Sequence, residues 1–173
     1  MSKTQHTDPN VYFREEQRFR QIWVWLLVGL VAGIAWYGTI VQLIYKKPFG
    51  SNPAPDSLML MIWVIFGLGL PLFFGSLRLK TEVRSDGVYV RFIPLHRSFQ
   101  TYPRENIEKC EVVTYRPLRD YGGYGIRYGS QGKAYNVSGN SGVKLNLTGK
   151  KSIMIGSQSS EQLAAAVRSI ISH

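Results

Sequence analysis

Few side chains in this chain are placed to do chemistry. The single cysteine, Cys110, lies in an alternating run beside Val112, which indicates a packed thiol rather than a nucleophile. The stretch Gly149-Lys150-Lys151-Ser152 is not a phosphate-binding loop, because Lys144 stands where that loop needs its first glycine. None of the histidines has metal-ligand spacing to the cysteine: His6, His96 and His173. The sequence therefore predicts no catalytic residue, no cofactor and no metal site.

The segment from Tyr115 to Tyr128 is the main candidate for binding, since it combines arginine and tyrosine with flexible glycines. Arginine and tyrosine are enriched at protein–protein hot spots, and they also suit a membrane surface or stacked single-stranded nucleic acid. A long loop whose tyrosines cover a β-domain is the alternative. The residues predicted to bind a partner or lipid are Arg116, Arg119, Tyr121, Tyr124, Arg127 and Tyr128.

Two apolar runs precede this segment and determine its location in the cell: Ile22–Tyr45 and Leu58–Leu77. Neither run contains Lys, Arg, Asp, Glu or His. At about 1.5 Å per residue, either run as a helix spans the roughly 30 Å hydrocarbon core of a bilayer. The sequence predicts transmembrane helices at 22–45 and 58–77, joined by an external loop at 46–57.

A secretory signal peptide is the main alternative for the first run. The run is longer than the usual 7–15 residues or so, and no small-residue cleavage site follows it. Within the run, Gly29 and Gly33 form a small-xxx-small pattern that allows close helix packing. We expect these glycines to pack against the second span, with self-association as the alternative use.

The N-terminal part, residues 1–21, is expected to be a tail followed by an interfacial helix, or only a charged flank that fixes topology. Positive residues are concentrated before the first run and after the second, whereas the loop between has only Lys46 and Lys47. The positive-inside rule predicts a multi-pass protein of the plasma (bacterial inner) membrane, with both termini cytoplasmic.

Residues 79–173 are expected to form a cytoplasmic β-domain. Short alternating runs separated by turns, beginning with the turn Ser85-Asp86-Gly87, predict about seven or eight antiparallel strands in a barrel or sandwich. An apolar stripe predicts a C-terminal helix that caps one end: Leu163, Val167, Ile170 and Ile171. The predicted class is an α+β membrane protein with a two-helix transmembrane hairpin before this domain.

The order of motifs in this part resembles a known family. The stretches at 85–90, 125–127 and 142–157, followed by the helix, resemble bacterial pleckstrin-homology-like (PH-like) domains in membrane proteins with two spans, a family of unknown function. The resemblance implies fold and topology but no chemistry. Eukaryotic members often bind phosphoinositides through basic residues in the first strand-to-strand loop. That loop is identified here with Ser85-Asp86-Gly87, whose acid argues against such binding.

These features favour a non-catalytic, membrane-anchored PH-like scaffold, an accessory subunit of a membrane protein complex. The expected partners are the lipid bilayer and other membrane proteins or a second copy, with no nucleic acid and no small-molecule substrate. An enzyme is disfavoured by the lack of a catalytic constellation, and a channel by spans whose only obvious internal polar residue is Gln42. The alternative function is a binder of anionic lipid headgroups through a basic face, since the chain carries a net charge of +10.

Overall fold

The computed structural model describes residues 10–129, 132–149 and 151–172. The chain divides into two compact units. The first combines the N-terminal part up to Arg18 with everything from Arg78 onward, and the second is Phe19–Leu77. The fold is α+β, as predicted, but the segments of the first unit are not contiguous in sequence.

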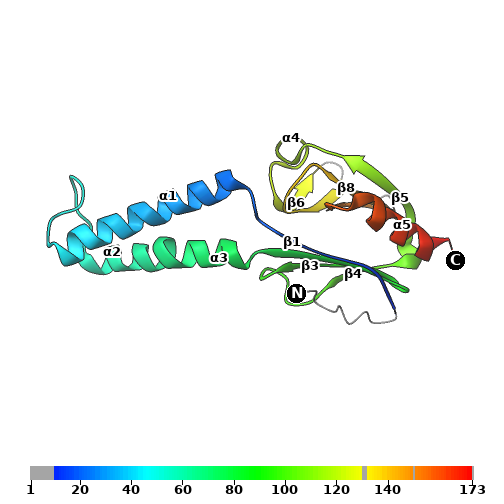
Figure 1. Ribbon diagram of the computed structural model, residues 1–173, viewed down its shortest axis with the longest axis horizontal. Helices are drawn as coiled ribbons and strands as arrows, with labels where there is room; N and C mark the ends of the chain where they lie inside the picture. The colour runs from blue at the N-terminus through cyan, green and yellow to red at the C-terminus, as the bar shows by residue number, and fades with distance from the viewer. Residues whose placement is uncertain (1–9, 130–131, 150, 173) are drawn as a thin grey trace, which may run out of the picture. The chain divides into compact units, whose positions relative to one another are not determined.

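The described part of the first unit contains two sheets (Figure 1). Sheet A has the strand order β1-β2-β3-β4, and sheet B has the order β5-β8-β9-β7-β6. The strands are β1 (Val11–Arg18), β2 (Arg78–Arg84), β3 (Gly87–Ile93), β4 (Gln100–Pro103), β5 (Ile107–Thr114), β6 (Gly125–Gly129), β7 (Gly132–Asn136), β8 (Ser141–Leu147) and β9 (Lys151–Gly156). Between and after them lie the 3-10 turn η3 (Arg104–Asn106) and the helices α4 (Pro117–Tyr121) and α5 (Ser160–Ile171).

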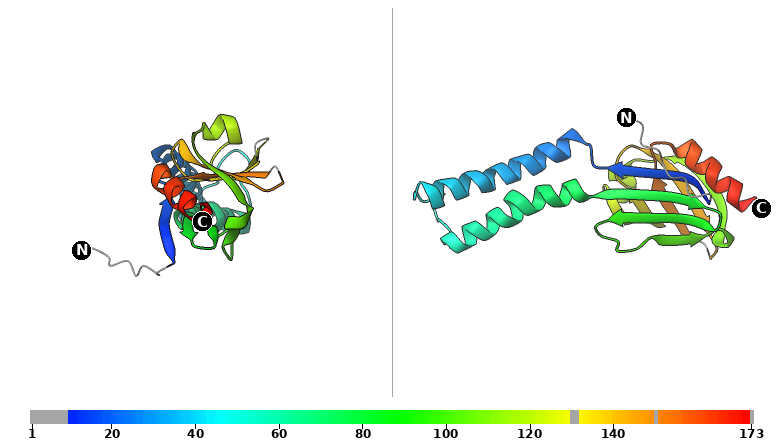
Figure 2. Two further views of the ribbon diagram at one scale, coloured as in Figure 1. Left: turned by 90° about the vertical axis from the view of Figure 1, so that its right-hand side faces the viewer. Right: turned by 60° about the horizontal axis from the view of Figure 1, so that its bottom comes forward.

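The strands do not form the purely antiparallel barrel that was one predicted outcome. Over the described residues the two sheets are separate layers, and Figure 2 shows sheet A with its four strands side by side and sheet B behind it. Within sheet B, β7 and β9 run parallel, because the chain crosses over through β8 between them. The predicted tight turn at Ser85-Asp86-Gly87 is confirmed, since it joins β2 to β3 with Arg84 opposite Gly87.

Strand β1 corrects the prediction of an interfacial helix before the first apolar run. Residues 11–18 alternate with period two, so Arg14, Glu16 and Arg18 are exposed while Gln17 is buried. The predicted helix does not form here because these residues pair antiparallel with β2, where Arg18 lies opposite Arg78. The first strand-to-strand connection is therefore residues 19–77, and the Ser85-Asp86-Gly87 turn is the second. The part of the predicted tail at residues 1–9 lies outside the described residues.

Two side chains of β1 tie it to the C-terminal half of the unit. The Gln17 Nε2 amide donates to the Gly156 carbonyl at 2.7 Å, in the buried interior. The Glu15 carboxylate accepts hydrogen bonds from the Ser157 hydroxyl and from the Gln158 backbone N–H, just before α5. These bonds connect the first strand directly to the last strand and helix.

Helix α5 contacts strands of both sheets. Leu163, Val167 and Ile170 of the predicted stripe are buried, and Ala164 joins them, whereas Ile171 is only half-buried. The helix therefore closes one side of the apolar interior, as the spacing indicates.

The second unit is a pair of helical segments, which agrees closely with the predicted spans. The first segment is α1 (Ile22–Thr39) and η1 (Ile40–Ile44), and the second is α2 (Asp56–Ile62), η2 (Trp63–Gly69) and α3 (Leu70–Ser76). Here η1 and η2 are π-helical. Both segments are long and apolar enough to cross a membrane, which favours membrane association by length and composition.

Specific polar contacts hold this helix pair together. The Trp36 indole donates to the Gly67 carbonyl at 3.2 Å, and its ring meets Trp63 edge to face at 5.1 Å. The Gln42 amide donates to the Ala54 carbonyl at 2.6 Å and to the Asp56 carboxylate at 2.9 Å. Gln42 thus fixes the connection between the helices instead of marking a polar pathway.

The direct pairing of Arg18 with Arg78 predicts that the helical unit is dispensable for folding of the first unit. A chain in which Asn-Gly replaces Phe19–Leu77 should be soluble and unfold in one cooperative transition, because a two-residue turn closes an antiparallel pair. The matched fragment 79–173, which lacks β1, should have a lower unfolding midpoint in urea. Equal midpoints for the two would contradict a structural role for β1.

Helix α5 supplies a second prediction. Leu163→Asp places an unpaired carboxylate at a fully buried position, so it should lower the free energy of unfolding by more than about 4 kcal/mol. Ala165→Asp, on the exposed side of the same helix, should change it by about 0.5 kcal/mol or less. Urea unfolding followed by thiol accessibility of Cys110 measures both. A similar loss for the two variants would show that α5 does not close the core.

Candidate functional site

The predicted binding segment lines a cavity of about 910 Å³ on the first unit. The lining includes the end of β5, helix α4 and the residues on either side of it. The lining residues are Thr114, Tyr115, Arg116, Pro117, Leu118, Arg119, Asp120, Tyr124 and Asn140. The cavity therefore brings Asn140, from the turn before β8, beside a segment about twenty residues earlier in the chain.

The local sequence explains why α4 forms at this position. Pro117 occupies the first turn, where its missing N–H is not needed. Asp120 accepts a hydrogen bond from the Arg116 backbone N–H at 2.8 Å, which holds the first turn closed. Gly122 then ends the helix in the left-handed region, at φ 68°. The helix is thus stopped after one turn, with its side chains held around the cavity.

Tyr121 corrects one predicted binding residue. Its side chain is buried and packs edge to face against Tyr115, with ring centroids 5.9 Å apart. Ala134 and Met154 complete this cluster. Burial raises the pKa of the Tyr115 phenol, so it stays protonated at neutral pH. Tyr121 therefore packs beneath α4 and is not in the cavity lining, whereas Tyr115 contributes to the lining from a buried position.

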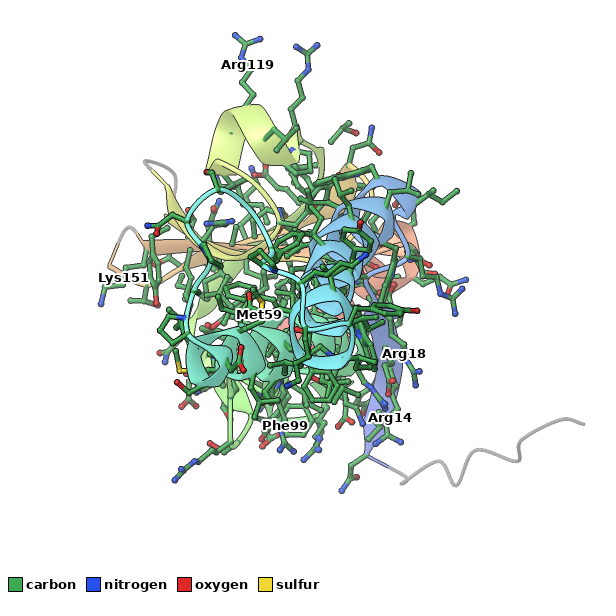
Figure 3. The ribbon with its side chains drawn as sticks, turned by 90° about the vertical axis from the view of Figure 1, so that its left-hand side faces the viewer. Arg14, Arg18, Met59, Phe99, Arg119 and Lys151 are labelled. Atoms are coloured by element: carbon green, nitrogen blue, oxygen red, sulfur yellow. The ribbon has the colours of Figure 1, made fainter. Side chains whose placement is uncertain are left out.

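The remaining predicted residues divide into two groups. Arg116, Arg119 and Tyr124 line the cavity, and Figure 3 shows the Arg119 side chain extending outward from α4. Arg127 lies on β6 and is turned back, since its Nε donates to the Tyr124 carbonyl at 3.0 Å. Tyr128 is also on β6 and is 78% exposed. The centroid of its ring lies 5.4 Å from the Lys133 ammonium nitrogen.

The predicted site residues omit six of the nine lining residues, of which Leu118 and Asn140 are the most informative. Leu118 is 70% exposed, although leucine would be expected to face the core. It lies directly before Arg119 and two residues after Arg116, in a helix begun by proline, and this position was the available signal. Asn140 had no such signal, because only folding brings its turn to the cavity.

Gly29 and Gly33 do not pack against the second helical segment, which corrects the expected use of this motif. Both are exposed, and a Cβ added to either would meet nothing within 4 Å. The two segments approach closely instead at Gly67, where an added Cβ would lie 3.3 Å from the Trp36 ring, and Gly38 packs against Phe49 of the connection. The inward face of α1 is determined by Val24, Val28, Ala32 and Ala35. The rotation of the helix about its axis, which spacing alone cannot give, directs the glycines outward.

Candidates for chemistry are limited in the described residues. No three His, Cys, Asp or Glu side chains in that part of the chain come together as metal ligands. The Cys110 thiol is buried under α5, with its sulfur 3.9 Å from the Ala164 carbonyl oxygen. Burial raises the pKa of Cys110 to about 11. It is therefore a packing residue.

Together these features define an α+β protein with a two-sheet unit, a basic and aromatic cavity, and two long apolar helices. The chain belongs to the family described as "Family of unknown function (DUF6141)", which residues 4–173 match. Comparison with curated proteins produced no match.

The buried thiol predicts slow alkylation. With a pKa of about 11, about one Cys110 side chain in a thousand is a thiolate at pH 8. Maleimide labelling of the native chain should therefore be roughly 100-fold or more slower than that of the chain unfolded in urea, and should accelerate as the pH rises toward 11. Rapid labelling of the native chain at pH 8 would contradict this.

Proposed function

We propose that this protein is a non-catalytic interaction module anchored in a membrane by the helical unit. The observation that carries the proposal is the surface of that unit. In the apolar stretch of the first helical segment only 33% is buried, and in that of the second only 11%, although both stretches are strongly apolar. A helix of a soluble core would bury such residues, and an exposed apolar surface of this extent needs a covering. Lipid is the covering that suits apolar helices of bilayer length.

The topology proposed for the anchor follows from charge. Arg14, Arg18 and Arg20 precede the first helical segment, and Arg78 and Lys80 follow the second. The short connection between the segments has fewer cations, so the first unit belongs on the cytoplasmic side of a plasma membrane. Two crossings return the chain to the side where it began, which agrees with β1 and β2 being paired neighbours.

The fold proposed for the first unit is PH-like. Strands β1 to β4 form one antiparallel meander, and β5, β8 and β9 are consecutive neighbours in the other sheet. These seven strands followed by α5 support the proposal, because the resemblance implies seven strands and a C-terminal helix. On this interpretation α4, β6 and β7 are an insertion that builds the cavity, and the membrane hairpin is an insertion between the first two strands.

The cavity is the proposed partner site. Arg116 and Arg119 are exposed on its rim, and Leu118 and Tyr124 supply apolar and aromatic surface between them. Asp120 is the one carboxylate in its lining, and its bond to the Arg116 backbone keeps it at the helix. This combination suits an acidic segment of another membrane protein that carries an apolar anchor residue.

Site-specific photo-crosslinking in source membranes tests this proposal. A photoreactive amino acid at Leu118 should give one discrete adduct, and Arg116→Asp with Arg119→Asp should reduce it by about tenfold, because a charge-complementary contact becomes repulsive. Arg104→Asp with Arg168→Asp, at exposed positions outside the cavity lining, is the matched charge control and should leave the adduct intact. The same adduct from the exposed Thr148, or an adduct insensitive to charge reversal in the cavity, would overturn the proposal.

A further inference from the structure

The outer face of sheet A is a second basic surface, separate from the cavity. Directly paired residues on neighbouring strands point to the same side, and the pairs Arg14–Glu82, Glu16–Lys80 and Lys80–Arg91 place the charged residues together. The opposite side is the buried core, with Leu79, Val83, Val88, Val90 and Phe92. Six cations and two carboxylates on the strands give this outer face a net charge of +4: Arg14, Arg18, Arg78, Lys80, Arg84 and Arg91, with Glu16 and Glu82.

The two carboxylates order the cations. Glu16 lies within 3.5 Å of Arg18, Arg78 and Lys80, and Glu82 lies 2.8 Å from Arg14 and 2.6 Å from Arg84. Burial of Glu82 acts to raise its pKa, but hydrogen bonds from Arg84 and Arg14 outweigh it, so the pKa is lowered. Both carboxylates are therefore ionised at neutral pH, and each is shared among several cations, which leaves the excess positive charge fixed in a regular array.

Each cation keeps part of its side chain in solvent. Among the five cations that pair with Glu16 or Glu82, the exposed fraction of the side chain ranges from 57% for Arg14 to 34% for Lys80. Arg91 is partly buried, and Figure 3 shows Arg14 and Arg18 projecting from β1. Asp86, in the turn at one end of β2 and β3, accepts a hydrogen bond from the Tyr89 hydroxyl. At the other end of the described strands, Glu16 is the one acid beside four cations: Arg18, Arg78, Lys80 and Arg91.

Aromatic rings are placed among these cations. The Arg84 guanidinium lies 4.4 Å from the Tyr89 ring centroid and 5.6 Å from that of Phe99. Arg91 lies 5.9 Å from the Phe99 centroid. A face that combines guanidinium groups with tyrosine and phenylalanine suits the headgroup region, where amphipathic rings and cations are both favourable.

The chain holds the more basic end of this face close to the apolar helices. Only Phe19, Arg20 and Gln21 separate Arg18 from the start of α1, and Leu77 alone separates Arg78 from the end of α3. A fully extended residue spans at most about 3.6 Å, so both arginines lie within about 15 Å of a helix end. The headgroup layer on each side of a bilayer is about 5–8 Å deep. Where the helices cross a bilayer, both arginines therefore lie in this layer or directly beside it.

We propose that the outer face of sheet A binds the anionic lipid surface of the membrane that the helices cross, an inference that rests on the membrane anchor proposed above. The tether keeps the lipid surface at high effective concentration beside this face, whereas an acidic protein would have to compete for it. The cavity is then left for the protein partner, and the lipid contact orients the unit that presents it.

The test uses the full chain in lipid nanodiscs. A fluorophore at Thr101→Cys, opposite Tyr89 on β4, reports on the outer face, while the buried Cys110 stays unlabelled. A nitroxide on a phosphatidylcholine headgroup quenches it on close approach. Quenching should be about twofold or more stronger in discs with about a third phosphatidylglycerol than in phosphatidylcholine alone, and molar salt should remove the difference.

Two triple variants separate a specific face from general charge. Arg78→Gln, Lys80→Gln and Arg91→Gln should abolish the phosphatidylglycerol dependence, while Arg18 still pairs with Glu16. Arg104→Gln, Lys109→Gln and Arg168→Gln remove the same charge from η3, β5 and α5 and should preserve it. The salt measurement on the chain with its native arginines and lysine stands even where a variant folds poorly.

The outcomes distinguish this inference from the proposal that it rests on. Equal quenching in both lipid compositions, or equal loss in both triple variants, would overturn lipid binding by sheet A and favour an acidic protein surface as its partner. Failure of the chain to remain in the discs would overturn the membrane anchor itself, and this inference with it.

Discussion

The antiparallel pairing of β1 with β2 is the constraint on which the rest of the structure depends. Because Arg18 lies opposite Arg78, everything between them must leave the sheet and return to adjacent positions. Two helical segments joined by a short connection meet that requirement, and an even number of crossings is the only number that a membrane-spanning insertion at this point permits. The pairing of β1 with β2 therefore constrains both the sheet and the path of the helical insertion.

The same strand connects the extremes of the chain. Glu15 and Gln17 reach from β1 to Gly156, Ser157 and Gln158, immediately before α5. Gln17 is buried, so losing its bond would leave a polar group unsatisfied in the interior, at a penalty of about 1–3 kcal/mol. The first unit therefore takes residues from both sides of the helical hairpin, and its core is complete only when β1 has joined the C-terminal part.

The two basic surfaces differ in how their charges are held. On sheet A, most of the cations form ion pairs with Glu16 or Glu82. Cations held in this way over a broad face suit a partner whose surface repeats a negative charge, such as a layer of anionic lipid. On α4, Arg116 and Arg119 are exposed around a concave site with leucine and tyrosine beside them. A concave site with few charges and an apolar centre suits a single shaped partner. This difference in construction supports assigning lipid to one surface and protein to the other.

Local signals in the sequence determined the apolar helices, the strand-rich part and the terminal helix, because the relevant patterns are continuous runs, period-two alternation and a period-3.6 stripe. They also located Arg116, Arg119 and Tyr124, since arginine and tyrosine beside proline and glycine indicate an exposed turn. The predicted second span at 58–77 and the helical segment Asp56–Ser76 agree to within two residues at either end.

Only the tertiary structure decided the rest. The sequence predicts an interfacial helix or a charged flank before the first apolar run, whereas residues 11–18 form a strand because they pair with residues at least sixty positions away. Tyr121 is buried and Leu118 exposed because the supporting surface beneath α4 comes from β7 and β9. Gly29 and Gly33 face outward because the rotation of α1 is set by its contacts with the other helical segment. In each case the deciding contact is distant in sequence, so no local pattern could contain it.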